Sequence, residues 1–128
     1  MKIAIQGHST RGNEVIQILE SLGGKNSNSF TGESNLWYFI DLDGCIISDH
    51  KYALIRAEFK TYTLEEFEKE FPFIVGDKVK HITSICTIIK YCYINNKPAY
   101  EVKSMELGVI AHIPVEMLEP YKKNENRN

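Results

Sequence analysis

The spacing of apolar residues changes within the first part of the chain. Ile3-Ala4-Ile5 is a short apolar run that ends at Gly7, which predicts a buried strand. Beyond Thr10 the apolar residues recur at the spacing of one helical face. These residues are Val15, Ile18 or Leu19, and Leu22. The pattern therefore predicts a strand, a loop and a helix within residues 3–24.

Both ends of this predicted helix carry suitable residues. Ser9 or Thr10 can cap its start through a hydroxyl oxygen, and a carboxylate at Glu14 suits the positive end of the helix dipole. Gly23-Gly24 allows the left-handed conformation that commonly ends a helix.

A hairpin and a further strand are predicted before residue 62. Residues 26–35 are rich in Asn, Ser, Gly and Thr, which is typical of a loop. Trp37–Ile40 and residues 45–47 are strand-like runs on either side of Asp43-Gly44, which predicts a hairpin with a type I′ turn. The loose alternation over residues 52–62 predicts a third strand.

A capping box then predicts a short helix. Thr63 is followed three residues later by Glu66, so each residue can satisfy the backbone N–H of the other. Pro72 disfavours helical geometry at Phe71, so the helix must end before it.

Beyond Pro72 the chain consists of short strand-like runs that follow one another at intervals of about ten residues, the rhythm of a small antiparallel barrel. The runs are residues 76–79, 86–93, 99–103 and 109–113, with Asn95-Asn96 as a turn. The stretches VGDKV, TIIKY, YEVK and IPVEMLEPY resemble the strands of SH3-like barrels, including a helical turn before the last strand. We therefore expect an α+β fold with an N-terminal strand-loop-helix and hairpin unit (residues 1–72), an SH3-like antiparallel β-barrel (73–121) and a disordered tail (122–128).

Composition narrows the class of protein. The 128 residues are 43% hydrophobic and 25% charged, as in soluble globular proteins. No apolar run approaches the ~20 residues of a membrane-spanning helix, and the first residues do not form a secretory signal, so we expect a cytoplasmic protein without a membrane partner. The formal net charge is -2, which disfavours nucleic acid as a partner because phosphate contacts need an excess of Lys and Arg.

Metal and disulfide chemistry are also disfavoured. The three cysteines, Cys45, Cys86 and Cys92, are odd in number and form no C-x-x-C pair, and the four histidines are scattered. We therefore predict no metal and no cofactor.

The loop Gly7-His8-Ser9-Thr10-Arg11-Gly12 is the main candidate site. A helix N-terminus offers unpaired N–H groups to an anion, the glycines permit close approach, and Arg11 can fork onto phosphate oxygens. Arg11 and Gly12 are also poor choices for a first helical turn, which favours a ligand. The alternative is a purely structural turn. His8 beside Ser9 is interpreted as a ligand contact and not as a catalytic pair.

Several resemblances bear on this loop. The first part of the chain resembles a Rossmann-type half unit, and LESLGGK is similar to a stretch of BRCT domains. The whole layout resembles small proteins of bacteriophages and prophages. That resemblance implies a counter-defence or host-interaction role, in the host cytoplasm if the chain is phage-encoded.

FIDLDGCIIS, residues 39–48, resembles motif one of the haloacid dehalogenase phosphatases. The resemblance implies Asp41 as nucleophile and Asp43 as acid/base around Mg²⁺. However, that family places the motif on a large doubly wound sheet, and the hairpin turn by itself accounts for Asp43-Gly44.

Tyr91 and Tyr93 share one face of a predicted strand, where they either pack in the core or stack on a base or partner. Three functions follow. The first is non-enzymatic sequestration of a phosphate-bearing, nucleotide-type small molecule by residues 7–12, with Tyr91 and Tyr93, in a homo-oligomer. The alternatives are a module that binds a protein, such as a host protein, or nucleic acid through the SH3-like barrel, and a phosphatase that uses Asp41 and Asp43.

Overall fold

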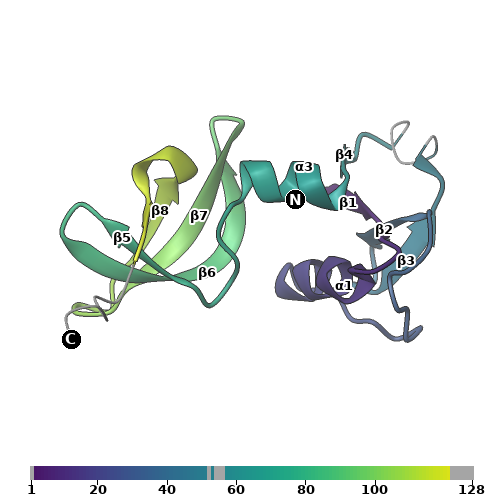
Figure 1. Cartoon of the computed structure of the whole chain (residues 1–128), viewed down its shortest axis with the longest axis horizontal. Helices are drawn as coiled ribbons and strands as arrows, with labels where there is room; N and C mark the ends of the chain where they lie inside the picture. Colours follow the sequence, from purple (N-terminus) through teal and green to yellow (C-terminus); the bar gives the residue numbers. More distant parts are fainter. Residues whose placement is uncertain (1, 52, 54–56, 122–128) are drawn as a thin grey trace. The chain divides into compact units, whose positions relative to one another are not determined.

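The computed structural model describes residues 2–51, 53 and 57–121, and its chain is mixed α+β (Figure 1). It divides into two compact units, Met1–Glu70 (unit 1) and Phe71–Asn128 (unit 2), close to the boundary expected at residue 72. The predicted tail, residues 122–128, lies outside the described residues. None of the helices in the described part of the chain is long and apolar enough to cross a membrane.

Among its described residues, unit 1 contains a four-stranded sheet and the helices α1 and α3, and Lys51 and Ala53 are also helical. The strand order is β3-β2-β1-β4, in which β1 runs antiparallel to β2 and parallel to β4. The elements are β1 (Ile3–Gln6), α1 (Gly12–Ser21), β2 (Trp37–Ile40), β3 (Ile46–Asp49), β4 (Lys60–Tyr62) and α3 (Leu64–Glu70). The predicted strand, loop and helix of residues 3–24 are confirmed. The strand expected over residues 52–62 is confirmed only as β4, and residues 52 and 54–56 lie outside the described residues.

The core of unit 1 is formed by residues at the helical spacing of α1 and by residues that alternate along β1. In α1, Val15 and Leu19 are fully buried, as the helical spacing requires. Ala4 and Ile5 point to opposite sides of β1, and both are fully buried. The sheet is therefore covered on both faces at its centre.

The hairpin β2–β3 is confirmed, but the predicted type I′ turn is wrong. A type I′ turn needs positive φ at both central residues, whereas only Gly44 in this turn has it, with φ of 84°. The Asp41 N–H donates to the Cys45 carbonyl at 2.8 Å, and the Gly44 N–H donates to the Asp41 carbonyl at 3.1 Å. These bonds, with a single left-handed glycine, are those of a longer hairpin turn that ends in a glycine bulge.

The capping box at the start of α3 is confirmed. The Glu66 N–H donates to the Thr63 hydroxyl at 3.1 Å, and the Thr63 N–H donates to the Glu66 carboxylate at 2.8 Å. The helix ends at Glu70, before Pro72, as predicted.

Unit 2 contains one five-stranded antiparallel sheet. Its order is β8-β7-β6-β5-β9. The elements are β5 (Lys78–His81), β6 (Ser84–Ile94), β7 (Lys97–Ser104), β8 (Ile110–Pro114), a 3₁₀ turn η1 (Val115–Met117) and β9 (Glu119–Pro120). Within the described residues the sheet has two edges, β8 and β9, and the expected closed barrel is not confirmed.

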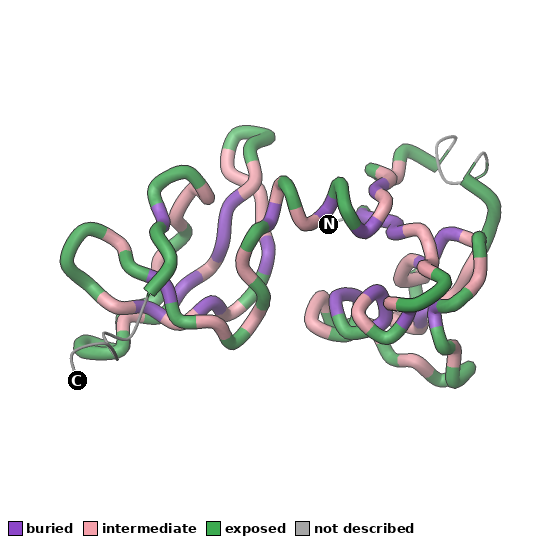
Figure 2. Tube along the Cα trace, in the orientation of Figure 1, coloured by how far each residue is buried: buried purple, intermediate pink, exposed green. Residues whose placement is uncertain are grey.

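Aromatic rings fill the core of unit 2. Tyr100 is fully buried, and its hydroxyl accepts the Phe73 N–H at 2.8 Å and lies 2.7 Å from the Phe73 carbonyl, to which it donates. The rings of Tyr91, Tyr93 and Tyr100 pack edge-on against Phe71. Burial raises the pKa of Tyr100 above its ordinary value, so this hydroxyl keeps its proton. Figure 2 shows the buried centre of each unit and the exposed turns.

Candidate functional site

Gly7 and Gly12 lie so close to the backbone of residues 31–36 that there is no room for a side chain at either position. A Cβ atom at Gly7 would lie 2.1 Å from the Ser34 carbonyl oxygen, and one at Gly12 would lie 2.4 Å from the Thr31 carbonyl oxygen. The Gly7 N–H also donates to the Leu36 carbonyl at 2.9 Å. Residues 31–36 therefore occupy the space along which the sequence suggested that a ligand could approach.

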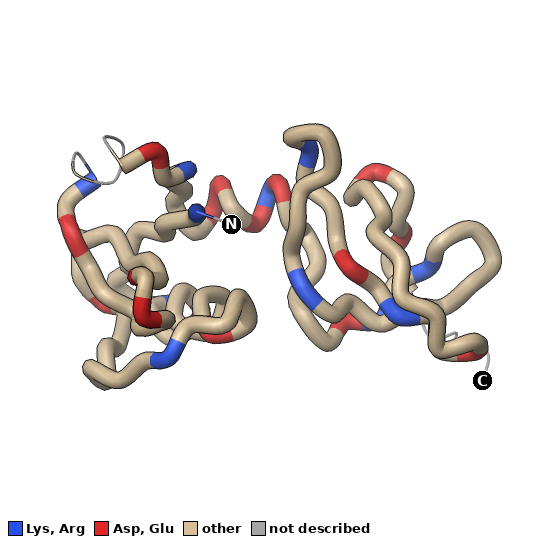
Figure 3. The backbone as a smooth tube through the Cα atoms, turned by 180° about the vertical axis from the view of Figure 1, so that it is seen from behind, with Lys and Arg blue, Asp and Glu red and all other residues tan. Residues whose placement is uncertain are grey.

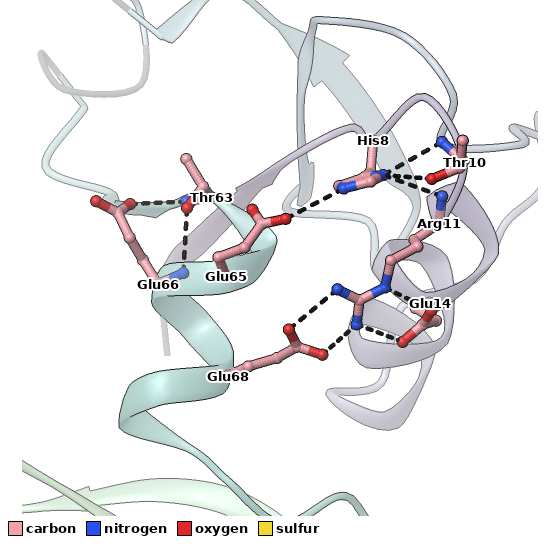
Figure 4. Close-up of polar contacts among 8 residues, drawn as sticks. All are labelled: His8, Thr10, Arg11, Glu14, Thr63, Glu65, Glu66 and Glu68. Atoms are coloured by element: carbon pink, nitrogen blue, oxygen red, sulfur yellow. Dashed lines mark hydrogen bonds and ion pairs between the residues drawn. The ribbon is translucent and has the colours of Figure 1, made fainter.

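His8 caps the start of α1. Its Nδ1 accepts the backbone N–H groups of Thr10 and Arg11, at 3.2 and 3.1 Å (Figure 4). Because Nδ1 accepts, the ring proton is assigned to Nε2, which donates to Glu65 at 3.1 Å. The predicted hydroxyl cap is wrong, because neither Ser9 nor Thr10 caps the helix: Arg11 is the N-cap residue, and its own side chain makes no cap bond.

The guanidinium of Arg11 lies between two carboxylates. It donates twice to Glu14, at 2.8 Å each, and twice to Glu68, once at 3.2 Å and once through a shorter contact (Figure 4). Hydrogen bonds from Arg11 hold the pKa of Glu14 below its usual range, while the two carboxylates raise the pKa of Arg11. Four of the five N–H groups of the guanidinium are engaged in this way.

The charge around this loop is negative. Arg11 is the one cation in the cluster drawn in Figure 4, and Glu14, Glu65 and Glu68 are three carboxylates in contact with it or with His8. A phosphate would have to displace two carboxylates from Arg11 and would meet like charge on arrival. The geometry therefore gives the anion hypothesis little support.

Part of this cluster could have been found from the sequence. Arg11 and Glu14 are three residues apart, which places them on one side of a helical turn. The contacts of Glu65 and Glu68 with residues 57 positions away had no such signal in the sequence.

The other candidate residues do not join this loop in one site. Asp41 Oδ1 accepts the N–H groups of Asp43 and Cys45, at 2.9 and 2.8 Å, so its carboxylate closes the β2–β3 turn. Tyr91 is 4% exposed, while Tyr93 is partly buried. Both rings pack against Phe71 within unit 2.

A second candidate site lies at one end of the sheet in unit 2. The β5–β6 turn and the β7–β8 turn are both at this end, and the Met105 N–H donates to the Ile85 carbonyl at 3.0 Å between them (Figure 1, left). Five large apolar side chains there are at least half exposed. They are Ile82, Met105, Leu107, Val109 and Ile110, and we call this set the apolar end.

Ile82 combines exposure with backbone strain. It is 70% exposed and has a φ of 58°, in a two-residue turn that joins the paired residues His81 and Ser84. A β-branched residue is unfavourable in the left-handed region, where glycine is the usual choice. Neither folding nor solubility accounts for isoleucine at this position, so the side chain is a candidate for contact with a partner.

Within the described residues, no group of three or more His, Cys, Asp or Glu side chains is arranged to hold a metal ion. Comparisons of the chain with profiles of known protein families, with curated protein sequences and with solved structures find no match.

Proposed function

We propose that the chain is a protein-binding module, in which the apolar end of unit 2 holds a polypeptide partner that presents apolar side chains. The observation that carries this proposal is the gathering of five exposed large apolar residues on two adjacent turns and at the first residue of β8. Exposed large apolar residues that gather at one end of a sheet mark interaction sites more often than scattered ones do.

The energetics favour burial of this end against a partner. Leu107 is 76% exposed and Met105 is 53% exposed, so water contacts most of each side chain. Full burial of such a side chain contributes about 1.5–3 kcal/mol. The strained backbone at Ile82 adds to the proposal, since an exposed isoleucine there gains a role only when a partner covers it.

The sheet order supports an SH3-like arrangement as part of this proposal. In unit 2 the chain forms a meander from β5 to β8, passes through η1, and returns as β9 beside β5. This is the succession of strands on which the resemblance to SH3-like barrels is based. The resemblance to phage and prophage proteins makes a host protein the kind of partner to be expected.

The proposal is tested by comparative capture with variants of the full chain. The double variant Leu107→Glu/Ile110→Glu places charge in the apolar end, and Leu42→Glu is a matched control, because Leu42 is a fully exposed leucine in the β2–β3 turn of unit 1. Thermal unfolding first establishes that both variants fold.

The expected result is a protein that the wild type and Leu42→Glu retain and that the double variant loses. With that protein purified, we expect its Kd to rise at least about tenfold for the double variant, as is typical of central interface residues. Retention of the same proteins by the double variant, or no retained protein with the wild type, contradicts the proposal. If sedimentation shows that the chain self-associates, the partner is a second copy of the chain and not a foreign protein. This result would also contradict the proposal.

A further inference from the structure

The outer face of the sheet in unit 2 is basic beside the apolar end. Val79 is buried while Lys78 and Lys80 are exposed, so these two lysines point to the face opposite the core. Pairing aligns Lys78 with Thr87, Thr87 with Lys103, and Lys103 with Ile110, and directly paired residues share a face. One row across four strands thus presents two lysines and ends at the apolar end.

The lysines of this row and Lys80 are not neutralised within unit 2. No ion pair joins Lys78, Lys80 or Lys103 to a carboxylate among the described residues. By contrast, Lys90 lies 3.8 Å from Glu101, which also contacts His112. Figure 3 marks these basic and acidic positions in blue and red. Glu119 of β9 is aligned with Lys80 and Glu106 lies in the β7–β8 turn, but neither forms an ion pair with these three lysines, which can therefore pair with external carboxylates.

Nucleic acid suits this face less well than an acidic polypeptide does. Binding to a phosphate backbone commonly uses about six to ten Lys or Arg contacts, and this face offers three lysines beside exposed Ile110 and Met105. A partner that carries carboxylates and apolar side chains together would match both the charge and the apolar residues.

We infer that the apolar end and the adjacent lysines Lys78, Lys80 and Lys103 together bind an acidic polypeptide segment in which carboxylates alternate with apolar residues. This inference rests on the proposed function and specifies the chemistry of its partner. The apolar residues of the segment contact Met105, Leu107 and Ile110, and its carboxylates pair with the lysines.

The test uses three labelled, end-capped peptides of about ten residues, roughly the longest strand in most proteins. They alternate valine with glutamate, glutamine or lysine, and binding to the full chain is measured by fluorescence anisotropy at low and high salt. The double variant Lys78→Glu/Lys103→Glu removes the basic row. Lys97→Glu is the matched control, because Lys97 is an exposed lysine at the start of β7, at the other end of the strand from Lys103.

We expect the glutamate peptide to bind at least about tenfold more tightly than the lysine peptide at low salt, with a smaller difference at high salt. The double lysine variant should lose this preference, and Lys97→Glu should keep it. Equal binding of the glutamate and glutamine peptides overturns the inference of an acidic partner. If the variant Leu107→Glu/Ile110→Glu then binds neither of these two peptides, the apolar site of the proposed function is still supported.

Two other outcomes also overturn the inference. The first is that no peptide binds. The capture experiment tests the proposed function separately from this result. The second is tighter binding of single-stranded DNA than of the glutamate peptide, lost in the double lysine variant, which would make this face a nucleic-acid surface.

Discussion

The Nε2 atom of His8 lies 3.1 Å from a carboxylate oxygen of Glu65, while Nδ1 of the same ring accepts two backbone N–H groups at the start of α1. One imidazole therefore caps a helix and joins it to the first turn of α3. Since the neutral ring does both, the loop in which His8 lies is stabilised by hydrogen bonds within unit 1.

Replacing His8 should destabilise unit 1. His8→Ala removes the acceptor for two helix N–H groups, and loss of a cap costs about 1 kcal/mol. His8→Asn keeps a short side-chain acceptor and should recover part of this loss. Chemical denaturation measures the free energy of unfolding, with Ser9→Ala as the control because Ser9 is exposed. Equal stability of His8→Ala and wild type would contradict the capping role.

Arg11 separates the structural interpretation of the loop from the anion hypothesis. Its bidentate contacts with Glu14 and Glu68 predict that Arg11→Ala lowers the melting temperature of the protein in the absence of any ligand. Arg11→Lys should recover little of this, because lysine cannot bridge two carboxylates in the same planar geometry.

The measurement is thermal unfolding with and without added phosphate and pyrophosphate. We expect no stabilisation of the wild type by either anion, because Arg11 is engaged and its surroundings are negative. A rise in melting temperature with pyrophosphate that Arg11→Ala abolishes would instead restore the anion site.

Acid should weaken the same contacts. Hydrogen bonds from Arg11 lower the pKa of Glu14, and the pKa of Glu65 is lowered by a backbone hydrogen bond and by His8. A carboxylate whose folded-state pKa is depressed adds stability above its unfolded value, about 4.3 for Glu, and loses it as the pH falls through the folded value. The melting temperature should therefore decrease as the pH is lowered below about 4.3.

The matched variants for this pH effect lie on one helix. Glu14→Gln should melt below the wild type at pH 7, and the difference should shrink as the pH falls through the acid range. Glu20→Gln is the control, because Glu20 is exposed on the same helix. A difference between wild type and Glu14→Gln that stays constant down to low pH would contradict the assignment.

Most of the fold could be predicted from local patterns in the sequence. The helical face of Val15 and Leu19 and the capping box of Thr63 and Glu66 depend on neighbours within one element, so the sequence predicts them. The turn at Asp43-Gly44 was harder, because Asp41 uses its side chain to close a longer loop. Type I′ sequences and glycine-bulge turns share the same Asp-Gly pair.

The candidate site was less accessible to sequence reasoning, for a physical reason. Gly7 suggested close approach of a ligand, but the atoms that approach it belong to residues 31–36, which only tertiary folding brings there. The partners of Arg11 include Glu68, far along the chain. Exposure of Ile82 and Leu107 likewise depends on the sheet, since both residues are typical of a core.

Gly7 provides a direct check of this close approach. In Gly7→Ala the new Cβ would overlap the Ser34 and Gly32 carbonyl oxygens, both of which are backbone atoms, so residues 31–36 would have to move. We expect a loss of about 3 kcal/mol, the upper range for overpacking. Gly23→Ala meets no atom within 4 Å and has only its φ of 101° against it, so it should lose about 1 kcal/mol. Similar losses for the two variants in chemical denaturation would contradict the predicted contact.

Replacing Ile82 with glycine should raise the stability of the fold and lower the affinity for a partner. Glycine adopts positive φ without the steric cost that isoleucine incurs, so Ile82→Gly should raise the free energy of unfolding by roughly 0.5–1 kcal/mol. The same change removes an apolar side chain that is 70% exposed, so affinity for the captured partner should fall. Ile82→Ala is the control, because it removes the same contact but retains a Cβ at positive φ. It should therefore weaken binding without stabilising the fold. Denaturation and titration with the purified partner measure the two effects, and a stabilised Ile82→Gly that binds as tightly as the wild type would remove Ile82 from the interface.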